Sequence, residues 1–592
     1  MRHRAQHSEK VQPAVHGLEV RRRDSREKTQ SPSPYITTLI MKRVLPSRRE
    51  FLRRGSAALT AGLGVGTLGP WVVADESATA QEPGIAHQAI ACSRREAAGA
   101  ARDVLRQGGN AIDAAVAALI VQCVIEPNNV GLGGYGGSLV VFHGKSGRVH
   151  AVDFDSRAPR KFDPATFNKS SALHGCRAVG VPGIVAGIDL ALREYGSLPF
   201  KSLAQAALGL AQEGTVVTRE LAGRFNNLAK QIDSVSRRAY FPNGVPMAGS
   251  RWVQTDLARL IRRLGDEGPA SFYKGDIAAT IVRQVQEGGG TLAEDDFHDF
   301  RASLVDPLYV PYRGYELYTP PLPSAGLTSL SILRTLEQFD AAQLAPWGAE
   351  YIERFAGASN LCWAERFEYF GDPDFVDVPV DELLSDTRAR SRAKILRERF
   401  PTNSAPMPAE TSSTVNIVVK DRDENLVSLT ATHGEAFGSR VAIEGLGLML
   451  GHGVSRFATN RSSPNFPAPR KRPQHNMSPL VIVRDGKPYA ALGLVGGPKI
   501  VTVTAQLAVN LIDFHAGAQQ VVSAPRIHTE GEEPIQVTSS THAEVREELR
   551  TKGRRIKIVP SIGGPANAVA IDPKTRRVEA AASNGPNGII VF

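Results

Sequence analysis

The sequence has few cysteines and, beyond its first 80 positions, neither a long apolar run nor a strong excess of one charge. The four cysteines show no CxxC spacing and no histidine pair lies near them, which argues against a zinc site but leaves one or two disulfides open. They are Cys92, Cys123, Cys176 and Cys362. No apolar run after residue 80 reaches the roughly 20 residues that span a bilayer, and no repeat of solenoid length is present. We therefore expect neither a stable membrane span nor a repeat architecture.

The net charge of +10 is concentrated at the N-terminus. Residues 1–80 contain 14 Lys and Arg against 7 Asp and Glu, whereas the rest of the chain contains 56 against 53. A basic excess confined to one end provides no basic face on the folded body. With 42% apolar and 22% charged residues, the body is that of an ordinary globular protein, and we expect no nucleic-acid partner.

The N-terminus reads as an export signal. The phrase SRREFLRR at residues 47–54 precedes a Gly/Ala-rich apolar stretch, and the small-x-small pattern Ala78-Thr79-Ala80 follows. This order predicts a twin-arginine signal cleaved near Ala80, and thus a periplasmic or secreted protein. The alternative, a membrane anchor, is disfavoured by the five glycines and one proline in the stretch. Because such signals start a chain, we assign residues 41–80 to the signal and 1–40 to an upstream extension.

The body begins with patterns for two helices and a hairpin. Ser93 with Glu96 predicts a capping box, and residues 111–123 predict a second helix that is apolar on all sides and therefore buried. A glycine-rich turn at 128–137 leads into a predicted hairpin of strands 138–143 and 149–154. Nucleotide-binding loops run from strand to helix, whereas this loop runs from helix to strand, so we exclude a nucleotide site.

The pattern changes at Thr414. Residues 180–400 are mostly amphipathic helix, whereas β-branched runs predict strands afterwards, at 415–419, 426–430, 480–483 and 489–494. Strands combined with helices in this way indicate a layered α/β architecture. A polar, proline-rich linker at 401–413 directly precedes Thr414. Such a linker would be accessible to processing.

A threonine at the start of a strand is by itself weak evidence for catalysis. However, phrases spread over residues 85–592 together resemble the gamma-glutamyltransferase (glutathione hydrolase) family. These phrases are GGNAIDAA at 108–115, GVPGIVAG at 180–187, FYKG at 272–275, YRGY at 312–315 with Pro320-Pro321, YFGDPDFV at 369–376, KRP at 471–473, MSP at 477–479 and Gly496-Gly497. The resemblance implies a four-layer αββα fold of the N-terminal-nucleophile type.

The resemblance also implies the catalytic residues. In the family the precursor cleaves itself before a threonine, which aligns with Thr414, and the freed α-amine then accepts the proton of the threonine hydroxyl. Thr432 aligns with a second threonine that contacts the nucleophile, and Gly496 and Gly497 align with the backbone N–H groups that stabilise the oxyanion. The alternatives are that Thr432 only caps a strand and that the two glycines form an ordinary turn.

The sequence departs from the family where the glutamyl group is bound. An arginine that grips the α-carboxylate aligns with Asp155, and an aspartate that grips the α-amine aligns with Arg456. Supporting polar positions align with Gly434 and Gly453, and a serine pair aligns with His475 and Asn476. Asp155 and Arg456 would then pair with each other or bind a group of opposite polarity, while Arg157 offers a replacement clamp. The alternative is that these are solvated surface charges.

The residues and the resemblance together predict a large chain of residues 81–413 and a small chain of 414–592 that stay associated. The substrate is a small-molecule amide, with water or an amine as acceptor. Family resemblance favours γ-glutamyl compounds such as glutathione, and the altered pocket favours another amide, as in glutaryl or cephalosporin acylases. A third alternative is a non-catalytic binding relative. This chemistry needs no metal and no organic cofactor.

Overall fold

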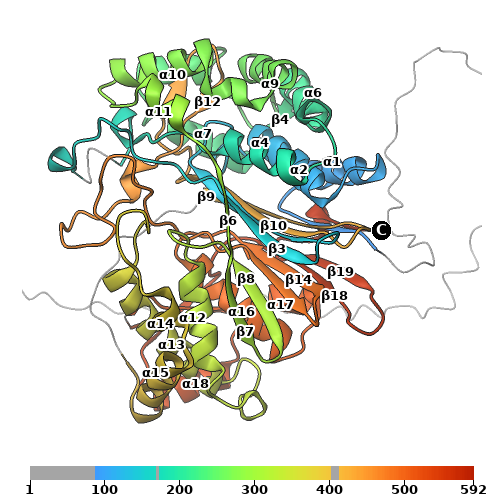
Figure 1. Cartoon of the computed structure of the whole chain (residues 1–592), viewed down its shortest axis with the longest axis vertical. Coiled ribbons are helices and arrows are strands. Elements are labelled where there is room, and N and C mark those ends of the chain that lie inside the picture. Colours follow the sequence, from blue (N-terminus) through green and yellow to red (C-terminus); the bar gives the residue numbers. More distant parts are fainter. Residues whose placement is uncertain (1–86, 169–172, 402–412, 532) are drawn as a thin grey trace, which may run out of the picture. The chain divides into compact units, whose positions relative to one another are not determined.

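Two β-sheets lie face to face between two layers of helices (Figure 1). The computed structural model describes residues 87–168, 173–401, 413–531 and 533–592. The predicted upstream extension and export signal, and most of the predicted linker, lie outside the described residues. Among the described residues no helix is both long and apolar enough to cross a membrane.

Each sheet takes strands from both sides of Thr414. The first sheet has the order β20 (Ile589–Val591), β1 (Ala89–Ala91), β9 (Ser413–Lys420), β10 (Leu426–Gly434), β2 (Gly136–His143), β3 (Arg148–Asp153), β6 (Ser303–Val305). The second has the order β19 (Val578–Ala582), β18 (Ala566–Ile571), β14 (Lys487–Leu494), β13 (Leu480–Arg484), β8 (Tyr315–Thr319), β7 (Leu308–Tyr312). Both parts of the chain therefore build both sheets.

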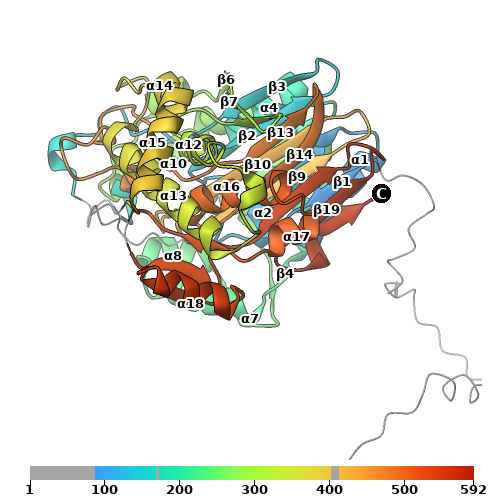
Figure 2. The ribbon, with the colours of Figure 1, turned by 90° about the horizontal axis from the view of Figure 1, so that it is seen from below.

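Helices cover the outer face of each sheet. Above the first sheet in Figure 1 lie α1 (Arg95–Arg106), α2 (Ala111–Ile125), α4 (Ile184–Tyr195), α6 (Gln205–Glu213), α9 (Thr255–Glu267) and α10 (Gly275–Glu287). Beyond the second sheet lie α12 (Gly326–Leu336), α13 (Ala349–Tyr369), α15 (Asp386–Glu398), α16 (Lys499–Ile512) and α17 (Ala518–Ser523), which Figure 2 shows from below. This is the four-layer αββα sandwich that the sequence predicts.

The helix α2 is the centre of the upper layer. Its N-cap Asn110 accepts the N–H groups of Ile112 and Asp113, and the Asp113 side chain accepts the Asn110 N–H, which completes a capping box. The predicted burial on all sides is confirmed, since every residue from Ala111 to Val124 is buried. The helix packs on β9 and β10, so it supports the strands that follow the predicted cleavage point.

Three sequence-based expectations need correction or completion. The capping box predicted at Ser93 and Glu96 is wrong: α1 begins at Arg95 without a side-chain cap, and the Ser93 hydroxyl donates instead to Glu126 at 2.6 Å. Residues 180–400, which the sequence predicts as mostly helix, also contribute the strands β6, β7 and β8. All four cysteines are free thiols, so neither of the disulfides that the sequence left open is formed.

The predicted strands around Thr414 are confirmed as the hairpin β9–β10. Its turn is organised by Asp421, whose carboxylate accepts the N–H groups of Asp423 and Asn425. The same carboxylate accepts the N–H of Ala111 at the start of α2, at 2.8 Å. The hairpin turn is thus tied to the N-terminus of the helix that packs on it.

Candidate active site

Thr414 and Thr432 face each other across two neighbouring strands. They are directly paired in the β9–β10 ladder, and the register shifts by one residue immediately afterwards, between Thr432 and Gly434. Thr414 Oγ1 donates to Thr432 Oγ1 at 3.3 Å, and both residues are buried. The two hydroxyl groups that the sequence singles out therefore lie together.

The Thr432 hydroxyl has three neighbours. It donates to the carbonyl oxygen of Ser413, it receives the hydroxyl of Thr414, and it accepts the N–H of Gly434 at 2.8 Å. Gly434 can bend the strand end back in this way because its φ of +98° lies in the left-handed region that glycine favours. The Ser413 carbonyl, at the predicted cleavage point, thus already receives a hydrogen bond.

Gly496 and Gly497 lie in the loop from β14 to α16. The Ser428 hydroxyl of β10 donates to the Leu492 carbonyl at 2.9 Å, and Gly493 packs against the side chain of Asn416. Ser428 is paired with Val418 of β9, and Asn416 lies between Val418 and Thr414 along that strand. The chain from Leu492 to Gly493 therefore runs towards the end of β9 at which Thr414 lies, and the two glycines continue in that direction.

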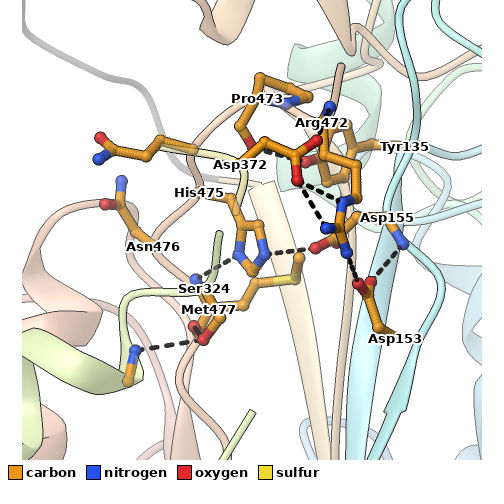
Figure 3. A network of polar contacts seen from close by, with 12 residues as sticks. Tyr135, Asp153, Asp155, Ser324, Asp372, Arg472, Pro473, His475, Asn476 and Met477 are labelled. Atoms are coloured by element: carbon orange, nitrogen blue, oxygen red, sulfur yellow. Dashed lines mark hydrogen bonds and ion pairs between the residues drawn. The ribbon is translucent and has the colours of Figure 1, made fainter. Parts of the chain in front are cut away.

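Asp155 and His475 form a buried pair (Figure 3). His475 Nε2 lies 2.6 Å from Asp155 Oδ2, and His475 Nδ1 accepts the N–H of Met477 at 3.2 Å. With Nδ1 acting as an acceptor, a neutral ring carries its proton on Nε2, the nitrogen that faces the carboxylate. Burial raises the pKa of Asp155 to about 7 and lowers the pKa of His475 to about 3. This contact joins two of the residues at which the sequence departs from the family.

Two further carboxylates and two guanidinium groups lie around this pair. Arg472 contacts Asp153 and Asp372, each at 2.6 Å, while the Asp155 N–H donates to Asp153. Arg366 donates to the carbonyl of His475 and to Asn476 Oδ1. Burial, followed by the Asp155 charge, raises the pKa of Asp153 to about 6. Arg472 is therefore the cation that compensates the charges of Asp153 and Asp372.

Arg456 lies on the edge of the same group. Its guanidinium stacks over the Tyr135 ring at 5.6 Å from the ring centre, and its Nε donates to the carbonyl of Gln474 at 3.3 Å. Its positive charge also acts on Asp155 and His475, lowering the pKa of each. The sequence-predicted residues Asp155, Arg456, His475 and Asn476 therefore converge.

This group lies at the same end of the sheet as Thr414. Thr414 pairs with Thr432, Thr432 with Gly136, and the Asp155 backbone packs on Gly136. Neighbouring strands are ~4.8 Å apart, which places the Asp155 backbone about 14 Å from Thr414. The Asp155 backbone and Thr414 are therefore about three strand spacings apart at one end of the first sheet.

The other three predicted positions have different settings. Gly434 packs against the ring of His452, and Gly453 packs against Ser156, in both cases where a Cβ would clash. Arg157 contacts Asp374 at 3.6 Å. It lines a separate cavity of about 230 Å³ that also contains the charged side chains of Arg301, Arg470, Asp296 and Asp299. Within the described residues, no group of three or more His, Cys, Asp or Glu side chains is arranged to hold a metal ion.

A model of the gamma-glutamyltranspeptidase family matches residues 97–589. The chain belongs to this family. Two similar relatives carry different names. The glutathione hydrolase proenzyme of Escherichia coli (strain K12) is 32% identical over 492 residues, which cover 78% of this chain and 84% of that protein. The acylase ACY 1 proenzyme of Pseudomonas sp. (strain V22) is 32% identical over 499 residues, covering 81% and 88%.

A solved structure shows the same gamma-glutamyltranspeptidase-family architecture. The cephalosporin acylase from Bacillus halodurans has a TM-score of 0.78 and 26% identity, and the match covers 88% of this chain and 99% of that one. Together with the family match, this identifies the fold as that of an N-terminal-nucleophile amidohydrolase. Relatives named as hydrolases of glutathione and relatives named as acylases are about equally similar to this family member, so identity alone does not select the acyl group.

Sequence reasoning missed several residues of the site. Arg472 and Asp372 belong to phrases that carried the family resemblance, KRP and YFGDPDFV, but no role followed from these phrases. Asn416 was given no role, although it bridges the two sheets: its amide donates to Thr430 Oγ1 at 3.1 Å, and Asn567 of β18 donates to its side-chain oxygen at 3.1 Å. An amide inside an apolar strand is a signal that could have found Asn416, whereas Arg472 and Asp372 lie in loops that carry no such pattern.

Proposed function

We propose that this chain is a self-processing amidohydrolase that cleaves its own backbone between Ser413 and Thr414 and then uses Thr414 as its nucleophile. The observation that supports this most directly is the position of the Thr432 hydroxyl. It contacts the attacking hydroxyl and the carbonyl oxygen under attack at the same time. A hydrogen bond to that oxygen stabilises the negative charge that develops during the attack.

Self-cleavage follows from this arrangement. Thr414 Oγ1 adds to the carbonyl carbon of Ser413, and its proton passes to the departing backbone nitrogen of Thr414. The C–N bond breaks and leaves an ester between the Ser413 acyl group and Thr414 Oγ1. Water then hydrolyses the ester, giving a Ser413 carboxylate and a Thr414 residue with a free α-amine. The two chains that result comprise residues 81–413 and 414–592.

Turnover uses the new terminus. An α-amine has an unperturbed pKa near 8, so it can accept the hydroxyl proton as Thr414 attacks a substrate amide. The N–H groups of Gly496 and Gly497 would stabilise the tetrahedral oxyanion. The amine leaves with a proton, an acyl ester forms on Thr414, and water or a second amine releases the acyl group.

Two acyl groups are candidates. Relatives named glutathione hydrolase suggest a γ-glutamyl group, with hydrolysis or transfer as the reaction. The buried Asp155–His475 pair favours the second candidate, an acyl group without a free α-carboxylate. A substrate carboxylate beside Asp155 would place a second acidic group in a buried setting that already raises the pKa of Asp155, and the neighbouring guanidinium Arg472 is already paired with Asp153 and Asp372. We therefore propose an acylase that acts on amides other than γ-glutamyl compounds.

The test of self-processing is intact mass and N-terminal sequencing of wild type, Thr414→Ala, Thr432→Val and Thr432→Ser. We expect wild type to yield a chain that begins Thr-Val-Asn-Ile, and Thr414→Ala to stay uncut. Thr432→Val keeps the side-chain shape and loses the hydroxyl, so it should cleave at least about 10-fold more slowly, whereas Thr432→Ser should cleave near the wild-type rate. An uncut wild-type chain would instead support a non-catalytic binding protein.

The acyl group is tested by turnover of p-nitroanilides that differ only in the acyl part. Simple acyl anilides without a carboxylate should be turned over at least about 10-fold better than γ-glutamyl-p-nitroanilide, measured as kcat/KM. The glutaryl anilide, which carries its carboxylate at the same position as the γ-glutamyl group, should be a poor substrate as well. Asp155→Arg, which introduces the charge that the family uses, should improve the γ-glutamyl substrate. A wild type that prefers the γ-glutamyl anilide would overturn the acylase assignment and leave self-processing intact.

Export is part of the same proposal. We infer that the twin arginines Arg48 and Arg49 direct the folded precursor across the inner membrane. Replacing both with lysine should leave the protein in the cytoplasm, as measured by fractionation and immunoblotting. Equal periplasmic amounts of the wild type and the lysine variant would exclude this route.

A further inference from the structure

The loop from Val495 to Pro498 has no side chain that could fix the direction of its N–H groups by itself. Gly496 and Gly497 have φ values of +142° and +60°, conformations that glycine adopts readily and also leaves readily. If these N–H groups are to stabilise a developing charge, their direction must be imposed by the surrounding structure. One short segment, Arg526–Glu530, supports the loop on both of its sides.

On the first side, Arg526 supports the chain against which the loop packs. A Cβ on Gly496 would lie 2.6 Å from Gly563 Cα, so the two backbones are in direct contact. The Gly564 N–H donates to the Val495 carbonyl at 2.7 Å. Arg526 Nη1 donates to the carbonyls of Ile562 and Gly564, each at 3.0 Å. The guanidinium therefore holds the partner chain of the loop.

Arg526 is an unusual choice for a purely structural role. It is 9% exposed, and burial lowers its pKa to about 10. Its side-chain hydrogen bonds go to backbone carbonyls, the third being that of Val522, and within the described residues it forms no ion pair. Burying a cation without an anionic partner is costly. The planar guanidinium fork, however, can bind two carbonyls at once in a fixed geometry.

On the second side, His528 supports the helix that the loop enters. The Ile500 N–H donates to the Gly497 carbonyl at 3.0 Å, so Gly497 is joined to the first turn of α16. His528 Nδ1 lies 2.8 Å from the hydroxyl of Thr502 in that turn, and His528 Nε2 lies 2.8 Å from Glu530. Both His528 and Thr502 are buried. The row Thr502–His528–Glu530 thus anchors the start of α16.

We propose that the segment Arg526–Glu530 is a clamp that orients the backbone N–H groups of Gly496 and Gly497, with Arg526 and His528 as positioning residues for the reaction. This inference rests on the proposed function, because it assigns the two glycines to the oxyanion. In the described part of the chain, the clamp is joined neither to Thr414 nor to the group around Asp155 by a hydrogen bond or ion pair of Arg526 or His528. It therefore acts on the stabilisation of the transition state and not on the binding of the acyl group.

The experiment compares three variants as mature, cleaved enzymes on the p-nitroanilide that the wild type turns over best. Arg526→Lys keeps the charge and loses the two-carbonyl fork, Thr502→Val keeps the shape and loses the hydroxyl, and His528→Gln is the milder change. We expect kcat to fall about 10-fold or more while KM stays within about 2-fold, because misdirected donors weaken only the interactions made in the transition state. A boronic acid with the same acyl chain, which forms a tetrahedral adduct, should lose affinity in parallel.

A matched control is Arg392→Lys, which alters another buried arginine, 2% exposed, that contacts Glu365 in the layer of α13 and α15. It should lower stability without lowering kcat. Hydrogen exchange of the peptide spanning residues 494–504 gives a readout that needs no activity, and this exchange should accelerate in Arg526→Lys but not in Arg392→Lys. If kcat is unchanged in an active Arg526→Lys enzyme, or the peptide exchanges at the wild-type rate, the clamp is wrong. An uncleaved wild type with the expected exchange pattern would overturn only the proposed function.

Discussion

At the scale of single residues, the most consequential departure is that the positions expected to bind a glutamyl group bind each other. Asp155 and His475 lie far apart in the sequence and meet at 2.6 Å in the fold. Each was identified as a candidate binding residue from the family resemblance, but their pairing was not predicted. Nothing in the local pattern of either segment specifies which distant side chain will approach it, and the resemblance supplied an arginine and a serine at these positions.

The Asp155 carboxyl should make the stability of the protein depend on pH. Burial raises its pKa from 3.8 to about 7, so the protonated form is favoured in the folded state. The stabilisation that this provides is complete below the ordinary pKa and is lost as the pH rises through about 7. Asp155→Asn keeps an acceptor for His475 Nε2–H and removes the ionisation.

We therefore expect Asp155→Asn to match the parent near pH 4 and to be more stable by at least about 1 kcal/mol at pH 8. The measurement is urea unfolding in the uncut Thr414→Ala background, so that a single chain unfolds. His475, with its lowered pKa, contributes the opposite slope below its ordinary pKa of 6.5, and this contribution is absent at pH 8, where the ring is neutral in the folded and unfolded states. Parallel stability curves for the two proteins from pH 4 to pH 8 would show that the carboxyl is not perturbed.

At the scale of elements, the hairpin β9–β10 and the buried helix α2 were predictable, because period-two and fully apolar patterns are strong signals. The strands β7 and β8 were not, since they are five residues each and lie within a region dominated by helical patterns. The capping box at Ser93 failed for a related reason. Its hydroxyl binds Glu126, a partner that only the tertiary structure brings near.

The sheets are joined at their centre by a polar bridge that affects stability. Asn416 of β9 and Asn567 of β18 are buried and hydrogen-bonded to each other. Asn416→Leu should lower the free energy of unfolding by about 2 kcal/mol, because Asn567 and Thr430 would then be left with unmet hydrogen bonds. The double variant Asn416→Leu/Asn567→Leu should recover part of this loss. Chemical denaturation of wild type, Asn416→Leu, Asn567→Leu and the double variant gives the coupling energy between the two residues. If the losses of the two single variants simply add in the double variant, the bridge is refuted.

At the scale of the whole molecule, the cleavage proposed at Thr414 divides the chain without dividing the fold. Strands β2 and β3, before the cut, and β9 and β10, after it, share the first sheet, and β8 and β13 pair across the cut in the second. Each fragment alone would expose open strand edges and large apolar faces. Two chains that share one core form an obligate interface.

We therefore expect the two chains to remain together after processing. Wild type should elute from a sizing column in native buffer at the same volume as uncut Thr414→Ala, although it shows two bands on a denaturing gel. The bands should separate on the column only at urea concentrations that also abolish the near-ultraviolet circular dichroism of the folded core. Elution of a free small chain in native buffer would contradict the shared-sheet arrangement, because the strand pairs β9–β10 and β2–β3 cannot part without unfolding the first sheet.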